Sequence, residues 1–479
     1  MAEEKKLVEQ ITSQSKDFAK WYTDVCLKAE LCIYSGVKGF VVIRPYGWAI
    51  WENVMNNVDA RLKNMGVTNV AMPVLIPEHL LLKEKEHVEG FAPECAWVTC
   101  GGDDVLEDRL AVRPTSETVF CDYWKDTVRS YRDLPQLLCQ WGSVVRWEKE
   151  TRPFLRTREF FWHEGHTLHA TPEDSLKFTL DILYMYEDFI QKDAAIPVIK
   201  GKKTDRERFA GAQATYTVES IMKDGKSLQS GTSHDFGDNF AKAFDIKYLD
   251  KNNKLVYATE TSWAISSRII GALIMVHGDD RGLKLPPHIA PIQLRVIPIR
   301  MKDDKNVEVA NKLYERIKKA GIKADIDLTD KTPGYKFADS EMKGIPIRLE
   351  IGPKDIENNV CVLVRRDTNE KIEVSLSNVE DEIKNLLEKI QQNMFDTAKK
   401  FLDSHIDIAY TKDELIEKMN TKTGFIKAMH CGDEECEASL KEEAGITSRC
   451  IPMEQEQISD KCAICGKPAK YEVIWGKSY

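Results

Sequence analysis

Apolar residues change their spacing several times along the first half of the chain, and each change predicts a different element. Helical spacing marks three stretches, at residues 7–33, 48–64 and 173–192. Short apolar runs predict strands at residues 69–77, 110–113 and 135–148. Residues 260–280 begin with strand-like alternation and turn helical near Ser267. Because the strands are joined by hairpins and irregular insertions, we expect an antiparallel sheet flanked by helices.

Residues 143–167 (SVVRWEKETRPFLRTREFFWHEGHT) interleave arginines, glutamates and aromatic residues. The polar run 149–155, which contains Pro153, suits a hairpin connection. Side chains two residues apart share one face of a strand. The even positions of the predicted second strand are Arg156, Arg158, Phe160, Trp162, Glu164 and His166. In the predicted first strand, Arg146 and Glu148 are two residues apart and therefore share a face. Such a face is costly to bury without partners, so the pattern indicates a binding surface.

The pattern changes after the proline-rich break at residues 283–293. Strands are then expected at 294–299, 324–328, 347–352 and 359–367, with helices at 307–322, 335–345 and 379–402. This alternation predicts a compact α/β unit of about 100 residues. The remaining segment carries five of the twelve cysteines. We therefore predict three domains, over residues 1–290, 291–395 and 396–479.

Composition narrows the class of protein. The 479 residues are 42% hydrophobic and 30% charged, and their net charge of −9 disfavours indiscriminate binding to nucleic acid. No apolar run reaches about 18 residues, so no membrane span is expected. The charged N-terminus, MAEEKKLVEQ, lacks the apolar core of a secretory signal. With mostly scattered cysteines, the sequence favours a reducing, cytoplasmic location.

Two cysteine pairs carry the clearest metal signal. Cys431 and Cys436 are separated by four residues, and Cys462 and Cys465 by two. Four thiolates in two close pairs match tetrahedral zinc, and no histidine or carboxylate is placed to leave an open catalytic position. The alternative is a group of ordinary reduced cysteines. We predict a structural zinc ion.

Three further polar segments suggest a binding site. Residues 113–117 (RPTSE) read as a helix start, which still can display Thr115 and Glu117 into a pocket. Residues 229–234 (QSGTSH) would alone be called a turn. Arg268 begins an apolar helix and opposes its dipole, which a bound anion would explain. Since the chain contains no GxxxxGK[ST] loop, we expect arginines to bind any phosphate.

These segments, in this order, resemble the signature regions of class II aminoacyl-tRNA synthetases. Residues 39–73 are similar to the first motif, Arg146-Trp147-Glu148 with Arg156 and Phe160 to the second, and Arg268 to the third. The third motif lacks the glycines that some class II enzymes carry before this arginine. The runs RPTSE and WHEGH make the resemblance specific for prolyl-tRNA synthetases of the archaeal/eukaryotic-like type, over nearly the whole chain.

The resemblance implies an α+β catalytic domain, an α/β anticodon-binding domain and a small C-terminal zinc-binding α/β domain. It also implies a two-step reaction, in which proline attacks the α-phosphate of ATP and the prolyl group then passes to tRNA(Pro). Magnesium would bridge the phosphates. The ATP-binding residues would be Arg146, Glu148, Arg156, Phe160, Gln229 and Arg268, with Arg146 and Arg268 acting in catalysis.

The same resemblance implies the proline site. Thr115 and Glu117 would take the secondary ammonium group, and Arg146 would meet the carboxylate. Trp162 and Phe209 would shape the ring pocket, although composition alone allows both to be ordinary core. The other expected contacts are Glu164, His166, Thr232 and His234.

Family members are homodimers that hold their interface at the first motif, so a homodimer is expected. Glu341, Arg348 and Lys354 are candidate anticodon contacts, and ordinary solvated charge is their alternative reading. Only about 100 residues separate the second and third motifs, as in enzymes without the large editing insertion. We therefore expect no editing domain, and measurable activation of alanine and cysteine.

Two other classes remain open. A non-catalytic, tRNA-binding regulator would usually lose the ATP-gripping arginines, yet Arg146, Arg156 and Arg268 are all present. A threonine or serine synthetase is the second alternative. For threonine a catalytic zinc would be expected, but the four cysteines lie far from the motifs in the sequence.

Overall fold

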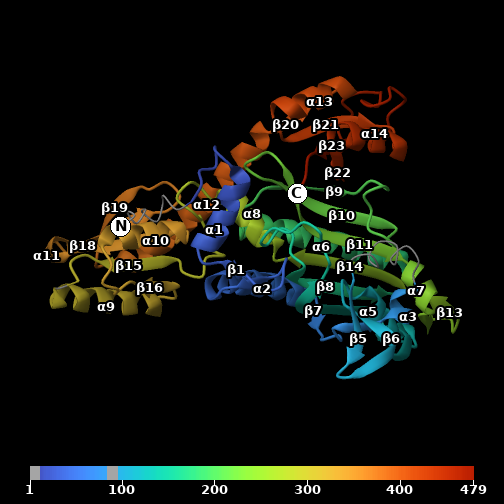
Figure 1. Ribbon diagram of the computed structural model, residues 1–479, viewed down its shortest axis with the longest axis horizontal. Coiled ribbons are helices and arrows are strands. Elements are labelled where there is room, and N and C mark those ends of the chain that lie inside the picture. Colours follow the sequence, from blue (N-terminus) through green and yellow to red (C-terminus); the bar gives the residue numbers. More distant parts are fainter. Residues whose placement is uncertain (1–10, 84–94, 302) are drawn as a thin grey trace.

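The computed structural model describes residues 11–83, 95–301 and 303–479. A long, mostly antiparallel sheet forms the middle of the molecule, a separate five-stranded sheet lies at one end, and the C-terminal segment extends one edge of the long sheet (Figure 1). Within the described ranges, none of the helices combines the length and the hydrophobicity needed to cross a bilayer.

The long sheet has eleven strands in the order β20-β21-β23-β22-β9-β10-β11-β14-β8-β7-β3. Its central strands are β9 (Val198–Lys202), β10 (Ala214–Ile221), β11 (Ser227–Gly237), β14 (Thr259–Ser266), β8 (Glu159–His169) and β7 (Gln136–Val145). These pair antiparallel, and β3 (Thr68–Asn69) adds a parallel edge strand. The predicted hairpin is present, because Val145 pairs with Glu159 and the register continues to Gln136 and Leu168. Its connection is longer than predicted and spans residues 146–158, so Arg146 and Glu148 follow the end of β7 and do not lie on the strand.

Both faces of this sheet are covered. Successive residues of a strand point to opposite faces, and Cys139 and Leu138 accordingly enter two different apolar cores. The helices around the first core are α1 (Phe18–Lys28), α2 (Pro45–Asn64), α6 (Pro172–Lys192) and α8 (Arg268–His277). The elements around the second are α3 (Glu78–Leu81), α5 (Glu117–Thr127), α7 (Asn239–Phe244), β4 (Leu75–Pro77), β5 (Ala96–Gly101), β6 (Asp104–Val112), the 3₁₀ helix η3 (Tyr131–Asp133), β12 (Lys247–Leu249) and β13 (Leu255–Tyr257). Leu168 belongs to the second core, so the even face of β8 looks toward it.

The prediction of one helix over residues 7–33 is wrong in its bounds. Residues 7–10 lie outside the described part, and α1 begins after Asp17, whose carboxylate accepts from the backbone amide of Lys20. The helix stops at Lys28, and Cys32–Tyr34 forms strand β1, paired with β2 (Val41–Ile43). Buried apolar residues continue through the turn and into the strand, so spacing alone did not reveal the end. The strand predicted at 69–77 is likewise two short strands, β3 and β4.

The predicted α/β unit is present. Its sheet has the order β16-β15-β17-β18-β19. The strands are β15 (Leu294–Pro298), β16 (Ala324–Ile326), β17 (Ile347–Ile351), β18 (Val360–Arg365) and β19 (Lys371–Ser375). The helices are α9 (Asp304–Lys319), α10 (Pro333–Met342), α11 (Pro353–Glu357) and α12 (Val379–Ser404).

The C-terminal segment joins the catalytic sheet directly. It contains β20 (Ile406–Ile408), α13 (Lys412–Thr421), β21 (Phe425–His430), α14 (Glu434–Ala444), β22 (Thr447–Pro452) and β23 (Tyr471–Gly476). Strand β22 pairs antiparallel with β9 at Ile451 and Pro452. A buried ion pair supports this seam: Lys203 Nζ lies 2.8 Å from Glu219 Oε1 and also donates to the carbonyl oxygen of Arg449. The C-terminal segment is therefore packed directly against the catalytic sheet.

Candidate active site

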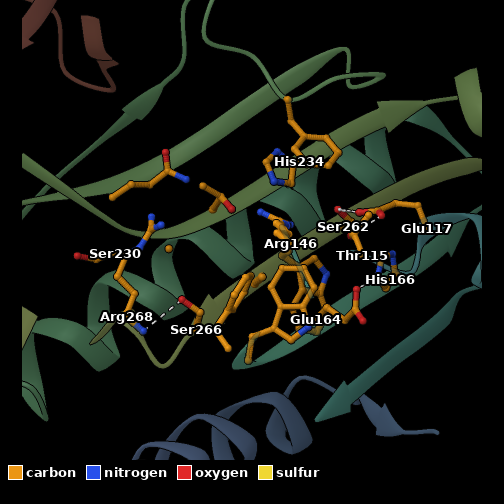
Figure 2. A pocket seen from close by; sticks show the side chains of 18 residues that line it. Thr115, Glu117, Arg146, Glu164, His166, Ser230, His234, Ser262, Ser266 and Arg268 are labelled. Atoms are coloured by element: carbon orange, nitrogen blue, oxygen red, sulfur yellow. Dashed lines mark hydrogen bonds and ion pairs between the residues drawn. The ribbon is translucent and has the colours of Figure 1, made fainter. Parts of the chain in front are cut away.

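Three adjacent strands bring the predicted pocket residues into cross-strand rows. His234 on β11, Ser262 on β14 and His166 on β8 are paired neighbours. Two further rows follow along the same face, Thr232 with Ala264 and Glu164, and Ser266 with Trp162. These residues line a cavity of about 160 Å³ that also receives Thr115, Glu117, Arg146, Phe160, Phe209, Gln229, Ser230 and Arg268 (Figure 2). The predicted binding face thus becomes one concave site.

Glu164 is the most firmly held carboxylate of this cavity. Its Oε1 accepts from Ser116 Oγ at 2.5 Å and from Gln140 Nε2 at 2.6 Å, and its Oε2 lies 3.1 Å from His166 Nε2. Burial raises the pKa of Glu164, but hydrogen bonds from His166, Ser116 and Gln140 outweigh burial and leave the pKa below its usual value. Glu164 is therefore an ionised, fixed anion in the wall of the pocket.

Glu117 provides a second carboxylate at the first turn of α5. Thr115 Oγ1 donates to its Oε2 at 2.5 Å, and Ser262 Oγ donates to its Oε1 at 3.3 Å. The helix-start reading of residues 113–117 is correct as well, since Ser116 precedes α5. Thr115, Glu117 and Ser262 gather at one end of the cavity (Figure 2). A hydroxyl and a carboxylate that converge there suit a small cationic group.

Guanidinium groups lie at the centre and the opposite end of the cavity. Arg146 is held by a bond from Nε to the Pro114 carbonyl, 3.1 Å, and its guanidinium carbon lies 5.4 Å from the ring centres of Phe160 and Trp162. Arg268, the first residue of α8, donates from Nε to the Leu155 carbonyl at 3.0 Å. Burial, then the charges of Arg156 and Arg146, lowers the pKa of Arg268 to about 10. Such a cationic cluster suits a polyanion.

His234 stays neutral in this setting. Burial, followed by the nearby His166 and Arg146, lowers its pKa to about 3. Its Nδ1 lies 2.9 Å from Thr215 Oγ1, and its ring lies 4.5 Å, centre to centre, from Phe209. These contacts fix the imidazole orientation, so His234 and Phe209 together form a rigid wall.

Two predicted residues lie outside the lining of the cavity. Arg156 Nη1 and Glu148 Oε2 form an ion pair at 3.3 Å on the hairpin connection. The prediction that Arg158 shares a strand face with Phe160 and Trp162 is also wrong, because β8 begins only at Glu159. Arg158 instead stacks on Trp147, with its guanidinium carbon 4.2 Å from the ring centre, and donates to the Lys38 carbonyl.

Sequence reasoning missed two buried residues next to the site. Gln140 on β7 accepts from Arg113 Nη1 at 3.2 Å and from the Met72 amide at 3.0 Å, which fixes the amide group that it offers to Glu164. Glu260 lies on β14, two residues before Ser262, and accepts from the Cys121 thiol at 3.3 Å. Alternation along β14 could have placed Glu260 on the same face as Ser262. No pattern in the local sequence indicates that Gln140 lies next to the site.

The anticodon candidates lie in the five-stranded unit. Arg348 on β17 is buried, and its guanidinium contacts Glu341 at 3.2 Å, Glu350 at 2.9 Å and the ring of Phe337 at 4.2 Å from its centre. Lys354 is exposed on α11. The ordinary solvated-charge reading therefore does not describe Arg348, which is part of a buried ion-pair network.

The four predicted cysteines come together at the start of α14 and the loop before β23. Cys431 Sγ lies 3.6 Å from Cys465 Sγ, and Cys436 Sγ lies 3.8 Å from Cys462 Sγ. A tetrahedron of sulfurs about 2.3 Å from zinc has edges of about 3.8 Å, so both of these sulfur–sulfur distances are compatible with a zinc site. His430 also lies within 4.8 Å of Cys431, Cys436 and Cys462, which the spacing argument missed. Its Nδ1 accepts from the Gly432 amide at 3.2 Å, and that lone pair is therefore already used.

The chain matches three family models in order. Residues 97–277 match the tRNA synthetase class II core domain (G, H, P, S and T), 293–386 match an anticodon binding domain, and 412–479 match the prolyl-tRNA synthetase C-terminal domain.

Full-length relatives agree with these matches. The chain is 58% identical, over the whole length of both proteins, to proline--tRNA ligase of Ruminiclostridium cellulolyticum and to that of Clostridium novyi. A crystal structure of prolyl-tRNA synthetase from Cryptosporidium parvum, complexed with halofuginone and AMPPNP, superposes with a TM-score of 0.95 at 38% identity, over 99% of this chain and 100% of that one. The chain therefore belongs to the prolyl-tRNA synthetases, the class II ligases that use ATP to attach proline to its tRNA.

Proposed function

We propose that the cavity between Glu117 and Arg268 is where proline and ATP react. The observation that carries this proposal is that Arg146 lies between an acid-and-hydroxyl end and an arginine end of one cavity (Figure 2). An amino acid needs the first end for its ammonium group, and a triphosphate needs the second. Arg146 is then the residue that can touch both substrates.

In the first step, a carboxylate oxygen of proline attacks the α-phosphorus of ATP. The bond between that oxygen and the α-phosphorus forms as the bond from the α-phosphorus to the bridging oxygen of the β-phosphate breaks, and pyrophosphate leaves with that electron pair. Two anions must approach each other, so catalysis needs charge neutralisation and positioning. Arg146 supplies a planar fork that can bind the carboxylate and the α-phosphate together, while Arg268 meets the polyphosphate from the other side.

Proline is held by the opposite end of the cavity. Thr115 and Glu117 bind its secondary ammonium, which has two protons to donate. Trp162 and Phe209 enclose the ring, and the remaining polar wall consists of Glu164, His166, Thr232 and His234. Because Glu164 is already satisfied by Ser116, Gln140 and His166, its role is to fix this wall rather than to take up a proton.

ATP enters between the strands and the hairpin connection. Phe160 stacks on adenine, Glu148 accepts from the adenine amino group, and Gln229 contacts the nucleoside. Arg156 binds the γ-phosphate, which requires its ion pair with Glu148 to open when ATP arrives. The two residues that lie outside the free cavity would thus join it through substrate binding.

Magnesium is proposed to arrive with ATP. The lining carboxylates, Glu117 and Glu164, already accept hydrogen bonds from hydroxyl and amide groups, so these residues do not form an oxygen cage for a resident ion. Magnesium is therefore treated as part of the nucleotide substrate.

In the second step, a ribose hydroxyl of the terminal adenosine of tRNA(Pro) attacks the prolyl carbonyl carbon. An ester forms, AMP leaves, and the hydroxyl proton passes to a phosphate oxygen. We assign catalysis to residues 1–290, anticodon binding to 291–395 and zinc binding to 396–479, with α12 continuous across the second boundary. Glu341, Arg348 and Lys354 are the proposed anticodon contacts.

The zinc ion is proposed to be structural. Its four thiolates, Cys431, Cys436, Cys462 and Cys465, leave no open position for a substrate. The ion would join α14 to the loop that leads into β23.

We also propose that the protein is a homodimer. The β1–β2 hairpin exposes four large apolar side chains, Ile33, Tyr34, Val37 and Val42, which supports a homodimer interface in the first-motif region.

Residues between β8 and β14 are used by α6, β9–β11, α7 and the β12–β13 hairpin, so we propose that no editing domain is inserted there. As a translation enzyme, the protein would work in the cytoplasm.

Amino-acid-dependent ATP–pyrophosphate exchange tests the proposed chemistry. Exchange should be fastest with proline among the twenty amino acids, and tRNA(Pro) should then accept labelled proline. Exchange that responds best to threonine or serine, or no exchange with any amino acid, would contradict the proposal.

A further inference from the structure

A second cavity lies at the junction of the three parts of the molecule. It has a volume of about 390 Å³, more than the cavity that holds Arg146. Its walls come from the C-terminal end of α8, the end of β10 with the turn after it, the 366–369 loop region and one face of α12. In Figure 1, α8 and α12 lie next to each other near the middle of the molecule, where these parts meet. A space of this size is within the range of small-molecule sites.

The lining is apolar over most of its surface. The apolar residues are Pro197, Ile221, Val276, Met394, Ala398 and Phe401. Water in such a space would find few hydrogen-bonding partners along these walls, so an apolar body can displace it favourably.

Lysines predominate among the charged residues of the lining. Lys223, Lys284 and Lys400 line the cavity, against a single carboxylate, Asp367. That carboxylate is already neutralised, because Arg365 Nη2 and Asn393 Nδ2 each donate to its Oδ2 at 2.7 Å. A cationic ligand would thus meet repulsion, and a metal ion would find no free carboxylate pair.

Lys223 is the best-placed partner for an anion. Its ammonium group donates to the carbonyl oxygens of Gly278 and, at 3.3 Å, of His277 at the C-terminal end of α8. An ammonium group has three donors, so one remains for a ligand. Burial, then the charge of Lys284, lowers the pKa of Lys223 to about 8, although Asp279 and Asp280 act in the opposite direction and Arg366 adds to the lowering. Lys284 also contacts Asp279 Oδ2 at 3.1 Å and the Asp367 carbonyl at 3.2 Å. Three cationic groups, Lys223, Lys284 and Arg366, thus act here together with two carboxylates, Asp279 and Asp280.

This cavity is separate from the proposed reaction site. Helix α8 presents Arg268 to the reaction site at its first residue, and Val276 and His277 to the second cavity at its last turn. A helix of ten residues spans about 15 Å. The two cavities share none of their lining residues.

We propose that this junction cavity binds a small amphiphilic anion, with an apolar body against Ile221, Met394 and Phe401 and one acidic group beside Lys223 and Lys284. Such a ligand would touch the catalytic part and α12 at once. It would bind the folded arrangement of the two parts and therefore stabilise it.

Two fluorescent probes of the same shape test the proposal on the full-length protein. The anionic probe is 8-anilinonaphthalene-1-sulfonate, and the neutral one is N-phenyl-1-naphthylamine, which lacks the sulfonate. Titrations are made with saturating ATP and L-prolinol, an unreactive proline analogue, so that the reaction site is occupied. We expect one anionic probe per chain, bound at least tenfold more tightly than the neutral probe.

Three variants locate the bound probe. Ala398→Trp fills the cavity from α12 and should abolish binding, and Lys223→Met removes the charge while keeping the volume and should weaken the anionic probe at least fivefold. Lys226→Met is the matched control, because Lys226 lies outside the lining, 3.5 Å from Asp224. It should bind the probe as the parent does, and proline-dependent exchange verifies that each variant is folded.

The results separate the possibilities. Unchanged binding in Ala398→Trp, or loss of the probe on adding ATP and L-prolinol, would place the probe elsewhere and overturn the proposal. Equal affinity for the two probes would overturn the requirement for an anion.

Discussion

The guanidinium group of Arg146 lies close enough to Arg268 to lower its pKa, although the two residues come from different elements of the fold. Burial and the charge of Arg156 act in the same direction, and together they bring the pKa of Arg268 to about 10. The free protein therefore holds like charges close together. A triphosphate bound at the proposed site would relieve this repulsion, and that relief would contribute to the binding free energy of ATP.

The first prediction concerns Arg146 itself. Arg146→Ala should lower proline-dependent ATP–pyrophosphate exchange by at least about 100-fold, because the approach of the carboxylate to the α-phosphate loses its neutralising fork. Arg146→Lys should recover only part of the rate, since lysine offers no planar pair of donors. Arg132→Ala, on an exposed 3₁₀ turn, is the control and should leave the rate unchanged. Near-normal exchange in folded Arg146→Ala would refute the assigned role.

The second prediction follows from Glu260, a buried carboxyl whose Oε1 has no hydrogen-bond partner among the described residues. Burial raises its pKa to about 8, and the neighbouring Glu117 adds to this effect. The proton is thus held more tightly in the folded chain than in the unfolded one, where the pKa is 4.5. Stability from this group is complete below pH 4.5 and is lost as pH rises toward 8.

Glu260→Gln removes this pH dependence because glutamine has no proton to lose. The free energy of unfolding of Glu260→Gln, minus that of the parent, should rise by on the order of 3 kcal/mol between pH 5 and pH 8. Urea unfolding at several pH values measures it, with the exposed Glu315→Gln as control. If the difference in the free energy of unfolding between Glu260→Gln and the parent stays constant from pH 5 to pH 8, Glu260 is already ionised in the folded protein at pH 5.

The sequence predicted the site better than it predicted the limits of the elements. Alternation along β8 placed Phe160, Trp162, Glu164 and His166 on one face, because a single strand has a fixed period of two. The rule failed at Arg156 and Arg158, where the backbone is not yet a strand. Gln140 belongs to a neighbouring strand, and its contact with Glu164 depends on the register of two strands, which spacing within one strand does not contain.

The third prediction concerns amino-acid selection. Alanine and cysteine are small enough to enter the cavity around Trp162 and Phe209, and an apolar pocket rejects a smaller side chain only through lost contact. Both should support ATP–pyrophosphate exchange, with kcat/KM below that for proline by roughly 100-fold or more. Alanyl-tRNA(Pro) should remain intact when incubated with the pure protein. Rapid hydrolysis would show that the chain carries an editing activity after all.

The fourth prediction distinguishes two ligand sets for zinc. Cys431, Cys436 and Cys462 belong to both, and the fourth position is Cys465 by sequence spacing or His430 by proximity. The Gly432 amide donates to Nδ1 of His430, so the neutral ring carries its proton on Nε2. Neither nitrogen then has a free lone pair for the metal. Cys465 Sγ, in contrast, lies at the edge length of a zinc–sulfur tetrahedron from Cys431.

Metal content of the purified protein decides between these sets. We expect one zinc ion per chain in the parent and in His430→Ala, and loss of the ion in Cys465→Ser, as in Cys436→Ser. Proline-dependent exchange should persist in Cys465→Ser at low temperature, because the cysteines lie in a part of the chain that does not line the reaction cavity. Its melting temperature should fall, since the proposed zinc ion would join α14 to the loop before β23 and these elements pack beside β22, which extends the catalytic sheet. Zinc retained in Cys465→Ser but lost in His430→Ala would assign the fourth position to the histidine.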